Sequence, residues 1–299
     1  MKIGIDLLGS ENTSQLLLKA VLDLCEKTPF EPHFFGKKTA DHSKAVWHES
    51  SHFVSMEDVG VSMAHNKDTS MYKGLEALKL GHIDAFISCG NTAALLTYSH
   101  LLLPKLPSII RLGLLATLQT QSGPCSIVDV GANVGATVHQ MRQFTLIGAA
   151  TFKALHGKDP RIGILNMASE KGKGPQTLNQ LYSFCQSLPN FIGFVEPSLI
   201  FEGGCDLVIT DGFTGNIFIK TAEAVAHMTL GKKISETPYD PSSYPGALLC
   251  GAEKLVMKCH GIGDTRALQK TIQEVLRLYS CNYLTRVKQE ISALKEESF

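Results

Sequence analysis

The residues best placed to do chemistry stand in one turn, Asp211–Asn216, which reads Asp-Gly-Phe-Thr-Gly-Asn. An apolar run, Leu207–Ile209, precedes the turn and is typical of a buried strand, and helical periodicity follows it. Gly212 and Gly215 let the backbone approach a ligand, and the free N–H groups at the start of a helix favour an anion. A plain strand-to-helix connection is the ordinary alternative.

Four other segments repeat this order of apolar strand, polar turn rich in Gly or Asn, and helix. Apolar strands that alternate with helices indicate an α/β fold with a mostly parallel, mixed sheet and helices on both faces. The carboxyl ends of parallel strands meet at one edge, so the turns together predict a site for a small anionic ligand. The four segments are 2–24, 85–104, 126–156 and 161–182.

Charge favours a local anion site over a nucleic-acid surface. The chain has 28 basic and 28 acidic residues, so it lacks the broad basic face that nucleic acid requires. Lys171, Lys173 and Lys220 follow the polar turns and could supply a basic pocket.

Other chemistries have weaker signals. Cys89 ends a strand just before Gly90, but no base accompanies it, so a buried core thiol is favoured over a nucleophile. Gly131–Gly135 lacks the glycine spacing of a dinucleotide site. No histidine pair has metal-ligand spacing, so neither a metal nor a cofactor is expected. His260 lies between a strand-like run and two glycines, and a site role and a structural role stay equally open.

Length and composition predict one domain over residues 1–299, with a single loose stretch at 231–244. Pro107 and Arg111 interrupt the most apolar region, so no membrane span is expected. Asp6 interrupts the position where a signal peptide would be apolar. The eight scattered cysteines indicate core thiols in a reducing cytosol.

With the turns laid out, the chain resembles the phosphate acyltransferases of bacterial phospholipid synthesis (acyl-ACP:phosphate acyltransferase, PlsX). The matching segments are spread over nearly the whole length, and together they are specific. They are Asp6–Glu11, Lys67–Met71, Ser88–Leu95, Asp129–Asn133, Asp211–Asn216 with Lys220-Thr221, and His260-Gly261 with Asp264.

The resemblance implies transfer of a fatty acyl group from acyl carrier protein to inorganic phosphate, which gives acyl phosphate. It also implies a three-layer fold like that of the isocitrate and isopropylmalate dehydrogenases, and a homodimer. Members of the family use a long amphipathic helical hairpin for membrane attachment and dimer packing. The short 231–244 loop stands in its place here, so a peripheral membrane contact stays open.

In the family reaction phosphate is itself the nucleophile, so the protein must hold it and polarise the thioester carbonyl. We expect Lys173, Asn216 and the backbone N–H groups around Gly212 and Gly215 to cradle the phosphate, and His260 to donate a proton to the leaving thiolate. Two alternatives stay open: an acyl-CoA donor, as in phosphotransacetylases, and a non-catalytic protein that binds acyl carrier protein. The remaining substrate-binding candidates are Gly90, Asn91, Thr92, Asn133, Asp211, Phe213 and Lys220.

Overall fold

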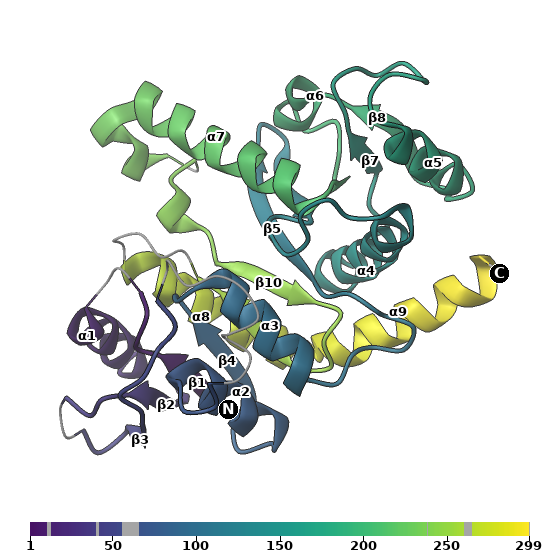
Figure 1. Cartoon of the computed structure of the whole chain (residues 1–299). Helices are drawn as coiled ribbons and strands as arrows, with labels where there is room; N and C mark the ends of the chain where they lie inside the picture. Colours follow the sequence, from purple (N-terminus) through teal and green to yellow (C-terminus); the bar gives the residue numbers. More distant parts are fainter. Residues whose placement is uncertain (11–12, 40–41, 56–65, 238, 260–264, 299) are drawn as a thin grey trace. The chain divides into compact units, whose positions relative to one another are not determined.

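The computed structural model describes residues 1–299 except 11–12, 40–41, 56–65, 238, 260–264 and 299 (Figure 1). The chain divides into two compact units, and each contains β-strands with helices packed against them. Unit 1 comprises residues 1–105 and 241–277, and unit 2 comprises residues 106–240 and 278–299. The expectation of a single domain stays a prediction.

Unit 1 has the strand order β3-β2-β1-β4-β11-β10, in which the first five strands are parallel and β10 is antiparallel to β11. Phe86 of β4 packs against Gly74 of α2, whereas α8 contacts α1 through a hydrogen bond from Gln269 to the carbonyl of Ala20. The strands are β1 (Lys2–Asp6), β2 (Glu31–Gly36), β3 (Val46–Glu49), β4 (Ala85–Ser88), β10 (Ala247–Cys250) and β11 (Leu255–Lys258). The helices are α1 (Ser14–Cys25), α2 (Ser70–Lys79), α3 (Thr92–Leu102), η3 (Pro241–Ser243) and α8 (Thr265–Ser280).

Unit 2 has the strand order β5-β6-β9-β7-β8, in which β6, β9, β7 and β8 are parallel and β5 is antiparallel to β6. The strands are β5 (Gly113–Thr120), β6 (Gly123–Val128), β7 (Ile162–Leu165), β8 (Phe191–Val195) and β9 (Leu207–Ile209). The helices are α4 (Val138–His156), α5 (Gln176–Cys185), α6 (Pro197–Phe201), α7 (Gly212–Leu230), η2 (Gly231–Glu236) and α9 (Tyr283–Ser298).

Alternate residues of the unit 2 strands face opposite layers of helices. Gly148 of α4 lies against Val128 and Leu207 on one face. The next residues along the strands, Ile127 and Val208, belong to a core on the other face that includes residues of α6 and α7. Figure 1 shows α4 and α5 together, with α7 apart from them. The predicted α/β fold with a mostly parallel, mixed sheet is confirmed.

Candidate active site

The candidate site residues fall into two groups, one in each unit. Gly90, Asn91 and Thr92 belong to unit 1, and the candidates from Asn133 to Lys220 belong to unit 2. His260 lies outside the described residues.

In unit 2 the predicted turns meet at one edge of the sheet. β6, β9 and β7 are parallel neighbours, so their carboxyl ends lie side by side. The Asp129–Asn133 turn follows β6, the Asp211 turn follows β9, and Asn166 follows β7. This is the crevice position at which open α/β sheets bind ligands.

The buried carboxylate of Asp129 fixes the first of these turns. Its Oδ1 accepts the N–H groups of Leu114, Gly131 and Ala132 at 2.9–3.2 Å. Its Oδ2 accepts the backbone N–H and the side-chain Nδ2 of Asn133 at 2.7 and 2.8 Å. Burial raises the pKa of Asp129 above its ordinary value, and these N–H donors oppose that shift. Asp129 therefore holds the turn and has no oxygen directed to a ligand.

The amide of Asn133 is committed to the same turn. Its Nδ2 donates to the carbonyl of Leu112 and to Asp129, both at 2.8 Å, which uses both of its hydrogens. Both hydrogens of this amide therefore have partners within the protein. A contact of Asn133 with substrate stays a prediction.

Asp211 is the N-cap of α7. Its Oδ1 accepts the N–H groups of Phe213 and Thr214 at 2.9 and 3.1 Å, and its Oδ2 accepts the Thr214 hydroxyl at 2.6 Å. The N–H of Gly212 donates to the carbonyl of Asn133, and that of Gly215 donates to the carbonyl of Asp211, both at 2.9 Å. The cap and the neighbouring turn thus engage these N–H groups in the structure. Their contact with phosphate stays a prediction.

Close packing accounts for these two glycines. A β-carbon at Gly212 would lie 2.8 Å from the nitrogen of Asn133, and one at Gly215 would meet the carbonyl oxygen of Asp129. The glycines therefore let α7 begin directly against the Asp129–Asn133 turn. Whether they also contact substrate stays a prediction.

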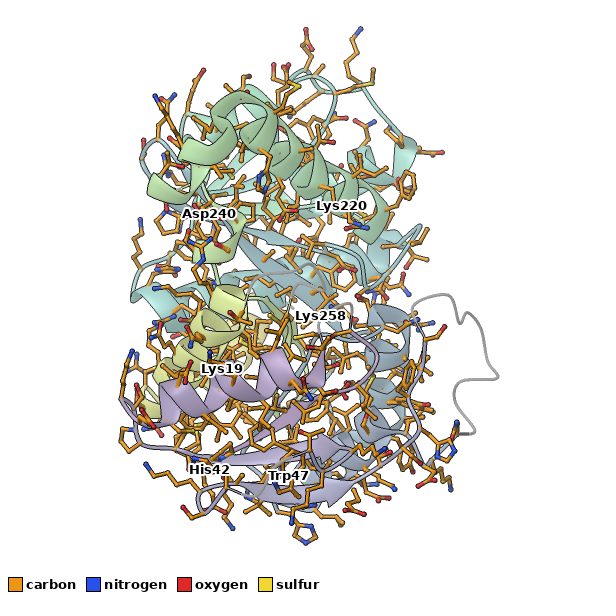
Figure 2. All side chains as sticks on the ribbon, turned by 90° about the vertical axis from the view of Figure 1, so that its left-hand side faces the viewer. Lys19, His42, Trp47, Lys220, Asp240 and Lys258 are labelled. Carbon is orange, nitrogen blue, oxygen red and sulfur yellow. The ribbon has the colours of Figure 1, made fainter. Side chains whose placement is uncertain are left out.

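The side chains left available at this edge are exposed. Asn216 lies beside Gly131, since a β-carbon added at Gly131 would be 3.8 Å from Cβ and Cγ of Asn216. Lys220, which Figure 2 labels on α7, is four residues beyond Asn216, and this spacing puts the two on the same side of the helix. Lys173 is exposed, and its carbonyl accepts Nδ2 of Asn166 at 3.1 Å. Lys171 lies over the ring of Tyr182, with its Nζ 4.9 Å from the ring centroid.

Unit 1 places a second polar cluster at its own strand edge. The buried Asp6 accepts the hydroxyls of Ser70 and Ser88 at 2.7 and 2.8 Å, and Ser88 accepts the N–H of Gly90 at 3.0 Å. Burial raises the pKa of Asp6 to about 6, against these hydrogen bonds and the charge of Lys258. This network orients the turn that opens α3.

Two other unit 1 candidates have structural roles. Asn91 is the N-cap of α3: its Oδ1 accepts the N–H of Ala94 at 3.0 Å, and its Nδ2 donates to the carbonyl of Ser55 at 2.7 Å. Cys89 is buried, and a hydrogen bond with Cys259 together with burial raises the pKa of its thiol. This burial agrees with the interpretation of Cys89 as a core thiol, which the sequence favoured over a nucleophile.

A groove of about 1400 Å³ opens at the same edge of unit 2 and runs along α7. Asn166, Thr210, Asp211 and Thr214 line it near the first turn of α7. Further along the helix, the lining side chains are mostly aliphatic or small. Sequence reasoning did not find this groove or Asn166. An asparagine directly after an apolar strand was the available signal for the latter.

Comparison with known proteins decides the family. A model of the family described as "Fatty acid synthesis protein" matches residues 1–234. A phosphate acyltransferase of Chlamydia felis is 36% identical over 314 residues, which cover 98% of this chain and 99% of the relative. One from Chlamydia pneumoniae is 35% identical over 289 residues, which cover 87% and 90%.

The chain belongs to the phosphate acyltransferase family. It is therefore an enzyme of the acyltransferase class, and its family serves fatty acid and lipid synthesis.

Solved structures place this phosphate acyltransferase family member in a known fold group. A phosphotransacetylase from Streptococcus pyogenes has a TM-score of 0.66 at 15% identity and covers 98% of this chain and 94% of its own. A 4-hydroxythreonine-4-phosphate dehydrogenase from Klebsiella pneumoniae has a TM-score of 0.54 at 9% identity, covering 93% and 99%. The expected kinship with dehydrogenase folds is confirmed at the level of the fold. Among the described residues, no helix is long and apolar enough to cross a membrane.

Proposed function

We propose that this enzyme transfers a fatty acyl group from acyl carrier protein to inorganic phosphate and forms acyl phosphate for phospholipid synthesis. The observation that carries the proposal is the strand edge of unit 2, where Lys173, Asn216 and Lys220 are exposed near the Asp129 and Asp211 turns. Family membership supports phosphate as the acceptor.

In this reaction a phosphate oxygen attacks the thioester carbonyl carbon, and the C–S bond of the tetrahedral intermediate then breaks. The electron pair leaves with sulfur as a thiolate, which takes a proton afterwards because a free thiol has a pKa of about 8.5. Phosphate is an anionic nucleophile at neutral pH, so the protein mainly has to hold and orient it.

Three side chains have proposed roles in holding the substrates. Lys173 balances the charge of phosphate, and Asn216 donates its amide to phosphate or to the developing oxyanion. Lys220 lies one turn beyond Asn216 and adds a second positive charge to the same side of α7. The other candidates for contacts with substrate are Gly90, Asn91, Thr92, Asn133, Asp211, Gly212, Phe213, Gly215 and His260.

Phosphate-dependent loss of acyl-ACP tests the assignment. Lys173→Ala and Asn216→Ala should each lower kcat/KM for phosphate by about tenfold to a hundredfold, which corresponds to one or two lost charge-assisted hydrogen bonds. Lys171→Ala is the matched control, since Lys171 lies over Tyr182. Near-normal turnover in both site variants would reject these roles.

A comparison of two acyl donors tests the assignment of acyl carrier protein. Acyl-ACP and acyl-CoA of the same chain length should be supplied at equal concentration, and we expect faster turnover with acyl-ACP. Faster turnover with acyl-CoA would assign a donor like that of the phosphotransacetylases.

Assembly and location complete the proposal. We propose a cytoplasmic homodimer that makes a peripheral membrane contact. Met228 of α7 is 81% exposed and lies outside the groove lining, which is consistent with a contact of either kind. Sedimentation equilibrium and flotation with vesicles of anionic phospholipid measure the two properties separately.

A further inference from the structure

In the described part of the chain, the groove of unit 2 is lined by one carboxylate and one amide, those of Asp211 and Asn166, and both stand at one end. Asn166, Thr210, Asp211 and Thr214 gather where β7 and β9 end and α7 begins. Asp211 is the single Asp, Glu, Lys, Arg or His among the described residues that line the groove.

The wall beyond that end is mostly apolar, with the hydroxyls of Thr221, Thr229 and Tyr239 among aliphatic and small side chains. Phe213, Ile217 and Val225 of α7 have exposed fractions of 57%, 49% and 49%, although each lines the groove. Of the 19 residues of this helix, all of which the structure describes, Gly212 and Gly215 alone are buried. So much exposed apolar surface on one helix marks a binding surface.

The distribution of polarity limits what can fill the groove. A protein partner normally meets a polar rim around an apolar centre. Here the carboxylate and the amide among the described lining residues stand at one end, and a mostly apolar wall extends away from it along α7. That pattern matches a molecule with one polar end and a long hydrocarbon tail.

We propose that this groove binds the hydrocarbon tail of the acyl donor, with the thioester at the first turn of α7 and the tail directed toward Leu230 and Tyr239. The inference rests on the proposed acyl transfer. Asn216 does not line the groove, but it belongs to the same first turns of α7 as Asp211 and Thr214. The first turn is therefore the place where one substrate can reach both the groove and Asn216.

Positions along α7 measure how far the tail extends into the groove. Ala222 and Ala226 line the groove, and they lie roughly 12 and 18 Å along the axis from Thr214 at 1.5 Å per residue. A phenylalanine at either position should block the groove at that depth. Ala224 is exposed and does not line it, so Ala224→Phe is a matched control on the same helix.

The experiment measures KM for a series of acyl donors that differ only in chain length. Each methylene buried should lower KM by about fourfold in the wild type and in Ala224→Phe. In Ala222→Phe the gain should stop at a shorter chain than in Ala226→Phe. Equal chain-length profiles in all four proteins would overturn the proposal, as would a groove variant that changes only the dimer mass or only vesicle binding.

A second readout separates this inference from the proposed function. Displacement of the fluorescent fatty acid cis-parinaric acid by unlabelled fatty acids is measured without phosphate or donor. Displacement that depends on chain length and is lost in Ala222→Phe supports the groove even if no donor is turned over. Phosphate-dependent turnover with no chain-length dependence would reject the groove and keep the function. Ala222→Leu is a milder variant that should show a smaller shift if Ala222→Phe does not fold.

Discussion

Gly215→Ala tests how α7 is seated on the Asp129–Asn133 turn. A β-carbon at Gly215 would meet the carbonyl oxygen of Asp129 and would lie 2.8 Å from Cγ2 of Thr210. The carbonyl belongs to a turn that the Asp129 carboxylate itself fixes, so it cannot rotate aside. The helix must therefore move away from the turn.

The magnitude follows from three terms. Replacing Gly by Ala within a helix gains about 1 kcal/mol. Overpacking costs about 1–3 kcal/mol, and loss of the hydrogen bond from Gly212 to Asn133 costs about 1 kcal/mol. We expect a net loss of about 1–3 kcal/mol in the free energy of unfolding, together with a higher KM for phosphate, because Asn216 moves with the helix.

Urea unfolding and phosphate kinetics measure the two effects. Gly148→Ala in α4 is the matched control, because its β-carbon would lie 3.0 and 3.1 Å from side-chain methyl groups of Val128 and Leu207, which can adjust. The control should stay within about 1 kcal/mol of the wild type. The reasoning is refuted if Gly215→Ala is as stable as the wild type and binds phosphate normally.

Three further predictions follow from buried groups. Because the pKa of Asp6 is raised to about 6 in the folded protein, the wild type loses roughly 3 kcal/mol of stability as pH rises from about 4 to 6. Asp6→Asn does not ionise, so in urea unfolding its stability relative to the wild type should be roughly 3 kcal/mol greater at pH 7 than at pH 4. Burial raises the pKa of Asp206, but the hydrogen bonds and charge of Arg161 outweigh burial and lower the pKa to about 2. Asp206→Asn should therefore lower the free energy of unfolding by about 2 kcal/mol at neutral pH, and this loss should shrink as pH falls from about 4 to 2. An unchanged difference across either pH range would contradict the corresponding assignment. Cys89→Ala should keep phosphate-dependent turnover within about threefold of the wild type, because the thiol is buried, and abolished turnover in a folded variant would restore the nucleophile hypothesis.

The fold was accessible from the sequence because its strands are short, apolar and bounded by polar turns. The runs at 2–7, 85–89 and 161–165 correspond to β1, β4 and β7. The strand order was not accessible. Ile209 ends β9, which pairs between β6 and β7 although it follows both in the chain. Such pairing depends on packing between segments far apart in sequence.

The site was only partly accessible, since composition does not reveal which donors are already used. Asp211 and Asn133 have the residue types that bind anions, but they satisfy neighbouring backbone groups instead. The same short polar side chains cap helices and organise turns. The groove was hidden for a related reason: the sequence shows that α7 is apolar, but only the tertiary structure shows which side lacks a partner.

The most direct test of the central claim is the fate of heavy-oxygen phosphate supplied with acyl carrier protein that carries a fatty acyl group. Mass spectrometry should find acyl phosphate that retains every labelled oxygen, formed at a rate that falls sharply in Lys173→Ala and Asn216→Ala. Release of free fatty acid without labelled acyl phosphate would contradict the account, because water and not phosphate would then be the acceptor.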